Sequence, residues 1–192
     1  QVTIHGSVFG GGNDADVKTN TEVNISKGTV EGNVYGGGNL GDVGNIDKTE
    51  ISNYLWKVNA QGVTTTEYNN TGKCEVIISG SAIIGNGTLS SDHGNVFGGG
   101  KGEESSFYCE KGMVYTTDVK IEDGTVNGNV YGGGQIGRVE SHTIVTVGPE
   151  NGAGDPEING SVFGAGAGLK THGYSALVRG NPVVTIQGNA KI

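Results

Sequence analysis

The sequence is poor in the residues that build helices. Leucine and methionine together number only 6 of 192 residues, whereas valine and isoleucine number 36. β-Branched residues lose side-chain freedom in a helix and are favoured in strands, so this composition excludes a helical protein and predicts an all-β one. Proline occurs three times and glycine 38 times. Because the glycines do not recur at every third position, a collagen triple helix is also excluded.

Cationic residues and long apolar runs are also scarce. Only two arginines occur, Arg138 and Arg179, the lysines are scattered, and the net charge is −8. A nucleic-acid groove needs a basic stripe, and an anionic membrane surface repels an acidic chain, so we expect neither partner. No run of apolar residues is long enough for a transmembrane helix, so we expect no membrane insertion.

The strongest positive signal is an internal repeat. A phrase of the form Gly-Asn/Ser-Val-Phe/Tyr-Gly-Gly/Ala-Gly starts at Gly6, Gly32, Gly94, Gly128 and Gly160. A second phrase, Val-x-Ile/Val, starts at Val23, Val76, Val119, Val145 and Val184. Self-similarity of this kind is typical of repeat architectures. The two phrases predict a parallel β-helix, or β-solenoid, of about five coils that forms a single segment over residues 1–192.

In such a solenoid, the inward residues of each coil stack on those of the next coil, about 4.8 Å away. Strand alternation makes Val23, Ile25, Val30 and Val34 the inward residues of one coil. The triple glycine lets the chain turn a corner that a Cβ would block. The Asn/Ser position of the phrase predicts a ladder in which each side chain bonds the one above it: Ser7, Asn33, Asn95, Asn129 and Ser161.

Both ends of the sequence fall inside a repeat. Residues 3–6 align with residues 29–32, and residues 184–188 open a further unit that stops at Ile192. Neither end carries a polar capping repeat, which an isolated solenoid needs. We therefore interpret the sequence as a segment truncated in mid-repeat. Its expected partners are neighbouring repeats of the same chain or identical chains placed end to end.

Two long inserts, residues 39–75 and 101–118, interrupt the repeat. Each reads as a β-hairpin, and we expect both to protrude on one side. Loops on a rigid scaffold often carry function, so their aromatic residues are candidate binding residues, with mutual packing of the hairpins as the alternative. These residues are Tyr54, Trp56, Tyr68, Phe107, Tyr108 and Tyr115. Cys74 and Cys109 predict either one disulfide that pins the inserts together or two separate buried thiols.

The glycine phrase contains an aromatic column of its own: Phe9, Tyr35, Phe97, Tyr131 and Phe163. Strict alternation after Val34 would turn these rings outward and make a surface for sugar rings or a partner. A bend between Val34 and Tyr35 would place the rings over the edge of the core. We favour the second, structural stack, and a ring whose tip reaches water fits the Phe/Tyr interchange.

Metal-binding and catalytic patterns are weak. Asp14, Asp16 and Asp42 follow triple glycines, as in the calcium turns of RTX repeats, but the spacing differs, and the alternative is aspartates that bond their own backbone. We expect no other cofactor. No nucleophile elbow, Cys/His pair or zinc-protease motif occurs, so we expect no enzyme. Two carboxylates brought together by folding, such as Glu75 and Asp118, would support an alternative, a polysaccharide-processing β-helix enzyme.

The Gly-Asn-Val-Tyr-Gly-Gly-Gly phrase resembles the arrays of large secreted or surface-anchored bacterial proteins of the gut Bacteroidetes type. Those arrays look like right-handed parallel β-helices of adhesin type. The resemblance covers the whole chain through its repeats and is specific for architecture rather than function. It implies an extracellular or cell-surface location and a role in structure, cell adhesion or a filament, with host glycans or proteins as candidate partners. The phrase contains no catalytic residue that could be carried over.

Overall fold

The computed structural model describes residues 2–46, 48, 71–87, 92–104 and 109–192. Within these ranges every regular element is a strand, and the strands pair in parallel in two sheets. No helix occurs in the described residues, and none therefore is long and apolar enough to cross a membrane. The composition thus predicted the all-β class correctly.

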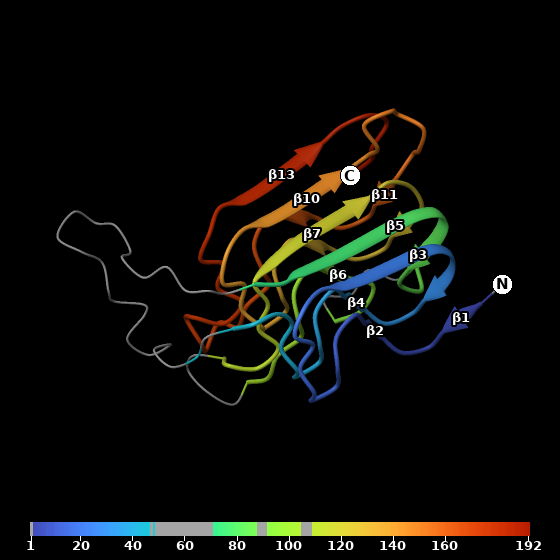
Figure 1. Ribbon diagram of the computed structural model, residues 1–192. Coiled ribbons are helices and arrows are strands. Elements are labelled where there is room, and N and C mark those ends of the chain that lie inside the picture. The colour runs from blue at the N-terminus through green and yellow to red at the C-terminus, as the bar shows by residue number, and fades with distance from the viewer. Residues whose placement is uncertain (1, 47, 49–70, 88–91, 105–108) are drawn as a thin grey trace.

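The larger sheet is built from the Val-x-Ile strands and is ordered β1-β3-β5-β7-β10-β13. Figure 1 shows its long strands side by side in chain order, with their arrows pointing the same way. Two short strands, β8 and β11, extend the row formed by the ends of β3 and β5. The strands are β1 (Thr3–Ile4), β3 (Thr21–Val30), β5 (Lys73–Ile84), β7 (Thr116–Ile121), β8 (Thr125–Val126), β10 (Thr143–Val147), β11 (Glu157–Ile158) and β13 (Pro182–Ile186).

The smaller sheet contains only two-residue strands, all taken from the glycine phrase, in the order β12-β9-β6-β4-β2. Each valine pairs with the valine of the next repeat, and each aromatic residue pairs with the next aromatic residue. The strands are β2 (Val8–Phe9), β4 (Val34–Tyr35), β6 (Val96–Phe97), β9 (Val130–Tyr131) and β12 (Val162–Phe163).

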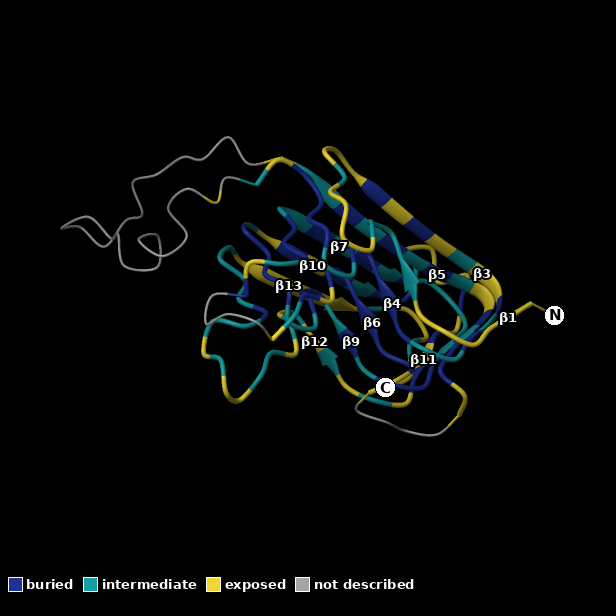
Figure 2. Ribbon diagram, turned by 90° about the horizontal axis from the view of Figure 1, so that it is seen from below, coloured by how far each residue is buried: buried dark blue, intermediate teal, exposed yellow. Residues whose placement is uncertain are grey.

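The core lies between the two sheets and consists of columns of equivalent aliphatic residues. Val23 pairs with Val76, and Val76 pairs with Val119. Along β3, buried and exposed residues alternate, so that Val23 faces the core and its neighbours face solvent (Figure 2). Burying a Val or Ile side chain contributes about 1.5–3 kcal/mol, and one unit gains this only when the next unit covers it.

A third row of contacts was not predicted. Valines that lie outside the two repeated phrases form isolated parallel bridges. Together with Cys74 they form a second apolar cluster. They are Val17, Val43, Val114, Val139 and Val178. The sequence does contain a signal for this row, since a valine follows the triple glycine by five positions at Val17, Val43 and Val139. The inserts stretch this spacing in the other two units and hide the pattern.

The same row corrects the boundaries of the inserts. The hairpin predicted for residues 101–118 is wrong in its second half, because Val114 bridges Val43 and Val139 in parallel and β7 begins at Thr116. Likewise, β5 begins at Lys73, so the last residues assigned to the first insert belong to the sheet. Packing of Val114 against the second apolar cluster outweighs the local hairpin pattern.

The glycines of the phrase are needed because the neighbouring unit comes very close. Neither Gly36 nor Gly37 has a positive φ. A Cβ on Gly36 would lie 2.3 Å from the carbonyl oxygen of Gly98, and a Cβ on Gly37 would lie 2.6 Å from the amide nitrogen of Gly100. In the last phrase, Ala165 takes the place of Gly37. No further phrase in residues 1–192 packs against it.

The Asn/Ser positions form a ladder, but its geometry differs from the prediction. The side-chain oxygen of each residue accepts the backbone N–H of its counterpart in the next unit. Asn33 Oδ1 accepts the Asn95 amide at 2.9 Å, and Asn95 Oδ1 accepts the Asn129 amide at 2.8 Å. One side-chain bond, from Asn95 Nδ2 to Asn33 Oδ1 at 3.2 Å, follows the expected pattern. The ladder therefore has a direction along the stack.

Candidate functional site

The five aromatic rings of the glycine phrase form one continuous stack. Neighbouring ring centroids lie between 4.6 and 5.0 Å apart, and the rings are nearly parallel. Tyr35 and Phe97 are each only 2% exposed. The Tyr35 hydroxyl donates to Gln135 Oε1 and accepts from Asn33 Nδ2, and burial raises the pKa of Tyr35 to about 12. The middle of the stack therefore offers no surface to a sugar ring and serves the structure.

The described bases of the two inserts lie against each other in adjacent layers. The Gly112 amide donates to the Leu40 carbonyl at 2.8 Å, and the Val43 amide donates to the Met113 carbonyl at 2.9 Å. Lys48 Nζ donates to the Glu110 carbonyl at 2.7 Å. The described bases of the two inserts therefore lie next to each other in the stack.

Most of the aromatic candidates of the inserts lie outside the described residues: Tyr54, Trp56, Tyr68, Phe107 and Tyr108. Tyr115 is described and is half-buried between Val114 of the third row and Thr116 of β7. Tyr115 is positioned by the parallel bridge of Val114 and by the start of β7, not by a protruding hairpin. As a binding residue, Tyr115 is therefore less accessible than the sequence suggested.

A buried ionic cluster lies in the layer next to the bases of the inserts, and no sequence pattern predicted it. The two arginines of the chain converge on one carboxylate, with Arg138 3.0 Å and Arg179 3.2 Å from Glu140. Arg138 is fully buried. Nearby, the carboxylate of Asp42 pairs with Lys48 and accepts the Met113 amide. Burial raises the pKa of both carboxyl groups, against the opposing effect of their cationic partners.

Of the two alternatives for the cysteines, the structure has the second, two separate buried thiols. Cys74 and Cys109 are both buried thiols, and burial raises the pKa of Cys74 to about 12. Cys74 occupies a row of threonines on the larger sheet and points into the second apolar cluster, whereas Cys109 lies near Arg138. The threonine hydroxyls of this row, those of Thr21, Thr117 and Thr143, each donate to a glycine carbonyl across the core. Cys74 therefore fills a structural position.

The carboxylates of Glu75 and Asp118 are neighbours on the outer face of the larger sheet, as the sequence allowed. Both are held by lysines: Lys73 lies 2.8 Å from Asp118, and Lys120 lies 2.5 Å from Glu75. The hydrogen bond from Lys120 lowers the pKa of Glu75. A general acid needs a raised pKa, so this pair is suited to holding strands together rather than to glycoside cleavage.

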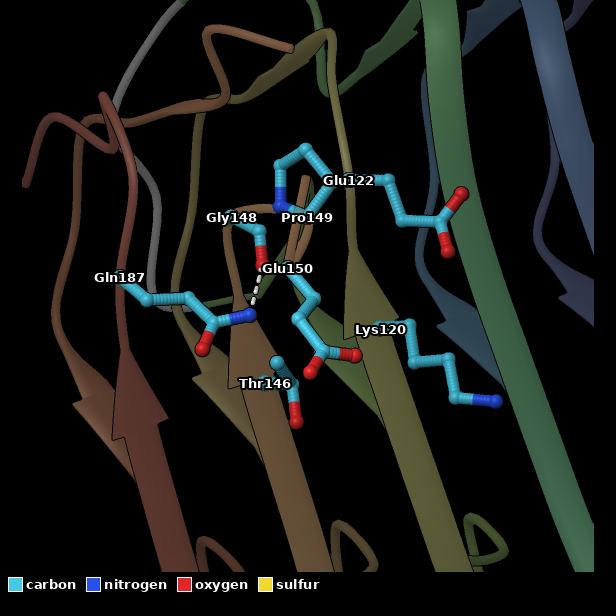
Figure 3. Close-up of a pocket in the computed structure, with 7 residues that line it drawn as sticks. All are labelled: Lys120, Glu122, Thr146, Gly148, Pro149, Glu150 and Gln187. Carbon is cyan, nitrogen blue, oxygen red and sulfur yellow. Dashed lines mark hydrogen bonds between the residues drawn. The ribbon is translucent and has the colours of Figure 1, made fainter. Parts of the chain in front are cut away.

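A groove lies on the same face, at the ends of β7, β10 and β13, and has a volume of about 230 Å³. Figure 3 shows its lining: Lys120, Glu122, Thr146, Gly148, Pro149, Glu150 and Gln187. Gln187 Nε2 donates to the Gly148 carbonyl at 3.0 Å and closes one side. In Figure 3 the carboxyl group of Glu122 extends away from Glu150. The groove is smaller than usual ligand pockets, and its two carboxylates do not converge.

The aspartates that resembled calcium turns have partners within the protein. Asp16 Oδ1 accepts the Asp42 amide at 3.0 Å, and its other oxygen lies 2.9 Å from Lys18. Asp14 lies 3.2 Å from Lys111. In the part of the chain that the structure describes, no group of three or more His, Cys, Asp or Glu residues could hold a metal ion. These aspartates act as bonds between layers.

Comparisons of the chain with protein-family models, with curated proteins and with solved structures found no match. In the described residues, each repeated row makes contacts that hold the fold together. The inserts are the part of the chain that differs from unit to unit.

Proposed function

We propose that the chain is a β-solenoid segment of a bacterial extracellular or cell-surface protein, with a structural and adhesive role. The handedness we propose is right-handed, in line with the resemblance of the repeated phrase. Two parallel sheets with in-register columns and a third row of bridges support the solenoid. Binding takes place through the inserts, with a host glycan or protein as the partner.

One observation carries this proposal: the repeated polar positions are used to hold one unit to the next. The Asn ladder bonds backbone amides, as Asn33 does with Asn95. The threonine row bonds glycine carbonyls, as Thr117 does with Gly132. The tyrosine hydroxyl of Tyr35 is bonded inside the protein. The repeated surface is thus a scaffold, and variable contact chemistry is left to the inserts.

The clamped bases of the inserts support the same role. Lys48 of the first insert bonds both Asp42 and the backbone of Glu110 in the second. A platform of this kind fixes the direction in which loops leave the scaffold, which reduces the ordering cost of binding. The bases of the two inserts are therefore held together.

The test is binding to arrays of glycans and host proteins, with the full chain and with a variant in which residues 49–70 are replaced by a short Gly/Ser linker. Asn45 and Thr71 are joined by an antiparallel bridge, so the linker closes a gap that the fold already holds. The matched control shortens residues 150–155, a loop away from the inserts. We expect binding to be lost only in the first variant. Binding that survives the replacement contradicts the role of the first insert.

A second candidate is a polysaccharide-processing enzyme. Its only support is the groove at the strand ends that Glu122 and Glu150 line, although their two carboxylates do not converge. It predicts release of reducing ends from a glycan panel and loss of that release in Glu122→Gln and Glu150→Gln. No release from any glycan at high protein concentration removes this candidate. Release that persists in both variants shows that the groove is not the site.

A further inference from the structure

Four asparagine–glycine pairs occur in the sequence, at residues 86–87, 127–128, 151–152 and 159–160. In each pair, the backbone nitrogen of the glycine can reach the side-chain amide carbon of the asparagine and close a ring with it. Glycine has no Cβ that would hinder this approach. The attack needs a nitrogen that is not engaged in a hydrogen bond and a side chain that can turn toward it. The structure therefore decides which of the pairs can react.

The pair at Asn127 is held by bonds to both neighbouring units. The Gly128 amide donates to the Gly94 carbonyl at 2.9 Å. Asn127 Nδ2 donates to the Gly85 carbonyl at 3.2 Å, and Asn127 Oδ1 accepts from Asn159 Nδ2 at 3.0 Å. Asn127 is only 8% exposed. An attack at this pair therefore requires that neighbouring units first separate locally.

The pairs at Asn151 and Asn159 are also held. The Gly152 amide donates to the Pro149 carbonyl at 3.0 Å, and Asn151 Oδ1 accepts the Ala153 amide at 3.0 Å. The side chain of Asn159 donates to the asparagine of the preceding unit, as described above. In each of these pairs, at least one hydrogen bond has to break before the ring can close.

The pair at Asn86 has a different environment. Asn86 and Gly87 are both exposed, and no described residue accepts the Gly87 N–H. A Cβ on Gly87 would meet nothing within 4 Å, so open space surrounds this part of the backbone. The side chain of Asn86 can therefore approach the glycine nitrogen without displacing a neighbouring unit.

Asn86 also belongs to an insertion, residues 86–93, at a point where the neighbouring unit has none. Ile84 pairs with Val30, and after Val30 the chain reaches the glycine phrase with only one residue between. The two ends of the insertion meet, since a Cβ on Gly85 would lie 2.9 Å from Gly94 Cα. A change at this asparagine therefore lies outside the stacked layers and leaves them in place.

We propose that Asn86 is a site of spontaneous deamidation in the folded protein, and that the fold protects Asn127 from the same reaction. The Gly87 nitrogen forms a bond to Asn86 Cγ, the bond from Cγ to Nδ2 breaks, and ammonia leaves with the proton of the Gly87 amide. Water then opens the cyclic imide at either of its carbonyls, which leaves an aspartate or an isoaspartate at this position. Water is the only co-reactant, and no electrons are exchanged.

The reaction changes the chemistry of a groove on the side of the stack. Asn86 and Gly87 line a groove of about 530 Å³ together with Thr29, Glu31 and Thr125. Glu31 is the one charged residue in the described lining. Deamidation adds a second carboxylate, so the groove becomes more acidic as the protein ages.

The experiment incubates the folded chain and the guanidinium-unfolded chain in mildly alkaline buffer and digests samples with trypsin at successive times. Tryptic peptides 74–101 and 121–138 carry Asn86 and Asn127 separately, so mass spectrometry follows each site by itself. In the folded chain we expect modification at Asn86, with Asn127 slower by roughly 10- to 100-fold because at least two hydrogen bonds must break first. In the unfolded chain we expect similar rates at the two sites.

Asn86→Gln is the matched control, because glutamine must close a larger ring and keeps an uncharged amide at this position. It removes the modification from peptide 74–101 and leaves the rate in peptide 121–138 unchanged. Three results each overturn the proposal: equal rates at Asn86 and Asn127 in the folded chain, an unmodified Asn86 in a folded chain whose unfolded form reacts, or an unchanged rate in peptide 74–101 of Asn86→Gln. The proposal goes beyond the scaffold role, and loss of insert binding leaves its outcome unchanged.

Discussion

Replacing Gly36 with alanine tests the closest approach between two units. The added Cβ would lie 2.3 Å from the Gly98 carbonyl oxygen and 3.0 Å from Val76 Cγ2. To reach an ordinary contact distance, the two units must separate locally by about 1 Å. Two interlayer bonds hold them together there, Gly36 N to Phe97 O at 2.9 Å and Gly37 N to Gly99 O at 3.1 Å.

The cost of this substitution has two parts. Overpacking costs about 1–3 kcal/mol, and weakening two backbone hydrogen bonds adds about 1 kcal/mol each. We therefore expect Gly36→Ala to lower the free energy of unfolding by about 3–5 kcal/mol. For a chain of this length, that corresponds to a fall in Tm of roughly 6–20 °C.

The assay is thermal and urea unfolding followed by far-UV circular dichroism. The matched control is Gly6→Ala, because a Cβ on Gly6 meets nothing within 4 Å and Gly6 does not have a positive φ. That change should be neutral or stabilise the chain by up to about 1 kcal/mol, since alanine restricts the unfolded state. If Gly36→Ala and Gly6→Ala unfold at the same midpoint, close backbone approach is not the reason for the repeated glycines.

Three further predictions concern polar side chains. Cys74→Thr should be about 1 kcal/mol more stable than Cys74→Val in urea unfolding, because only threonine can donate to the glycine carbonyl as its row does; equal stabilities would contradict this. Glu140→Ala should cost about 3–5 kcal/mol, since it removes the carboxylate that pairs with the fully buried Arg138, and Arg179→Ala should cost clearly less; similar losses would refute the cluster. The lowered pKa of Glu75 adds stability that is present above its usual pKa of 4.5 and is lost as the pH falls through the folded-state pKa. The stability difference between wild type and Glu75→Gln should therefore be about 0.5–1 kcal/mol at pH 7 and shrink as the pH falls below 4.5, and a difference independent of pH would contradict it.

The repeat phrases predicted which residues of successive units pair with each other. Val23 was expected to stack on Val76, and Tyr35 on Phe97, and the register contains both pairs. This was possible because a strand places its side chains with a period of two, so copies of a short phrase can pair in only one useful register. The adhesive role and the surface location remain predictions.

Other features were beyond a reading of the phrases. The row of Val43, Val114 and Val139 was missed because inserts break its spacing. The choice between a disulfide and two separate thiols depended on the direction of the Cys74 side chain, which is set by the register of β5. The orientation of the phrase aromatics depended on whether the chain bends after Val34, and spacing alone does not distinguish the two cases.

By itself, the sequence determined the all-β class and the identity of the stacked columns, because composition and short-range periodicity act through local backbone preferences. Only the tertiary structure decided that Arg138 and Arg179 meet on Glu140 and that the bases of the inserts share a layer. These contacts join residues far apart in the chain and depend on the direction of single side chains and backbone groups. That direction is set by packing of whole units, which no local pattern encodes.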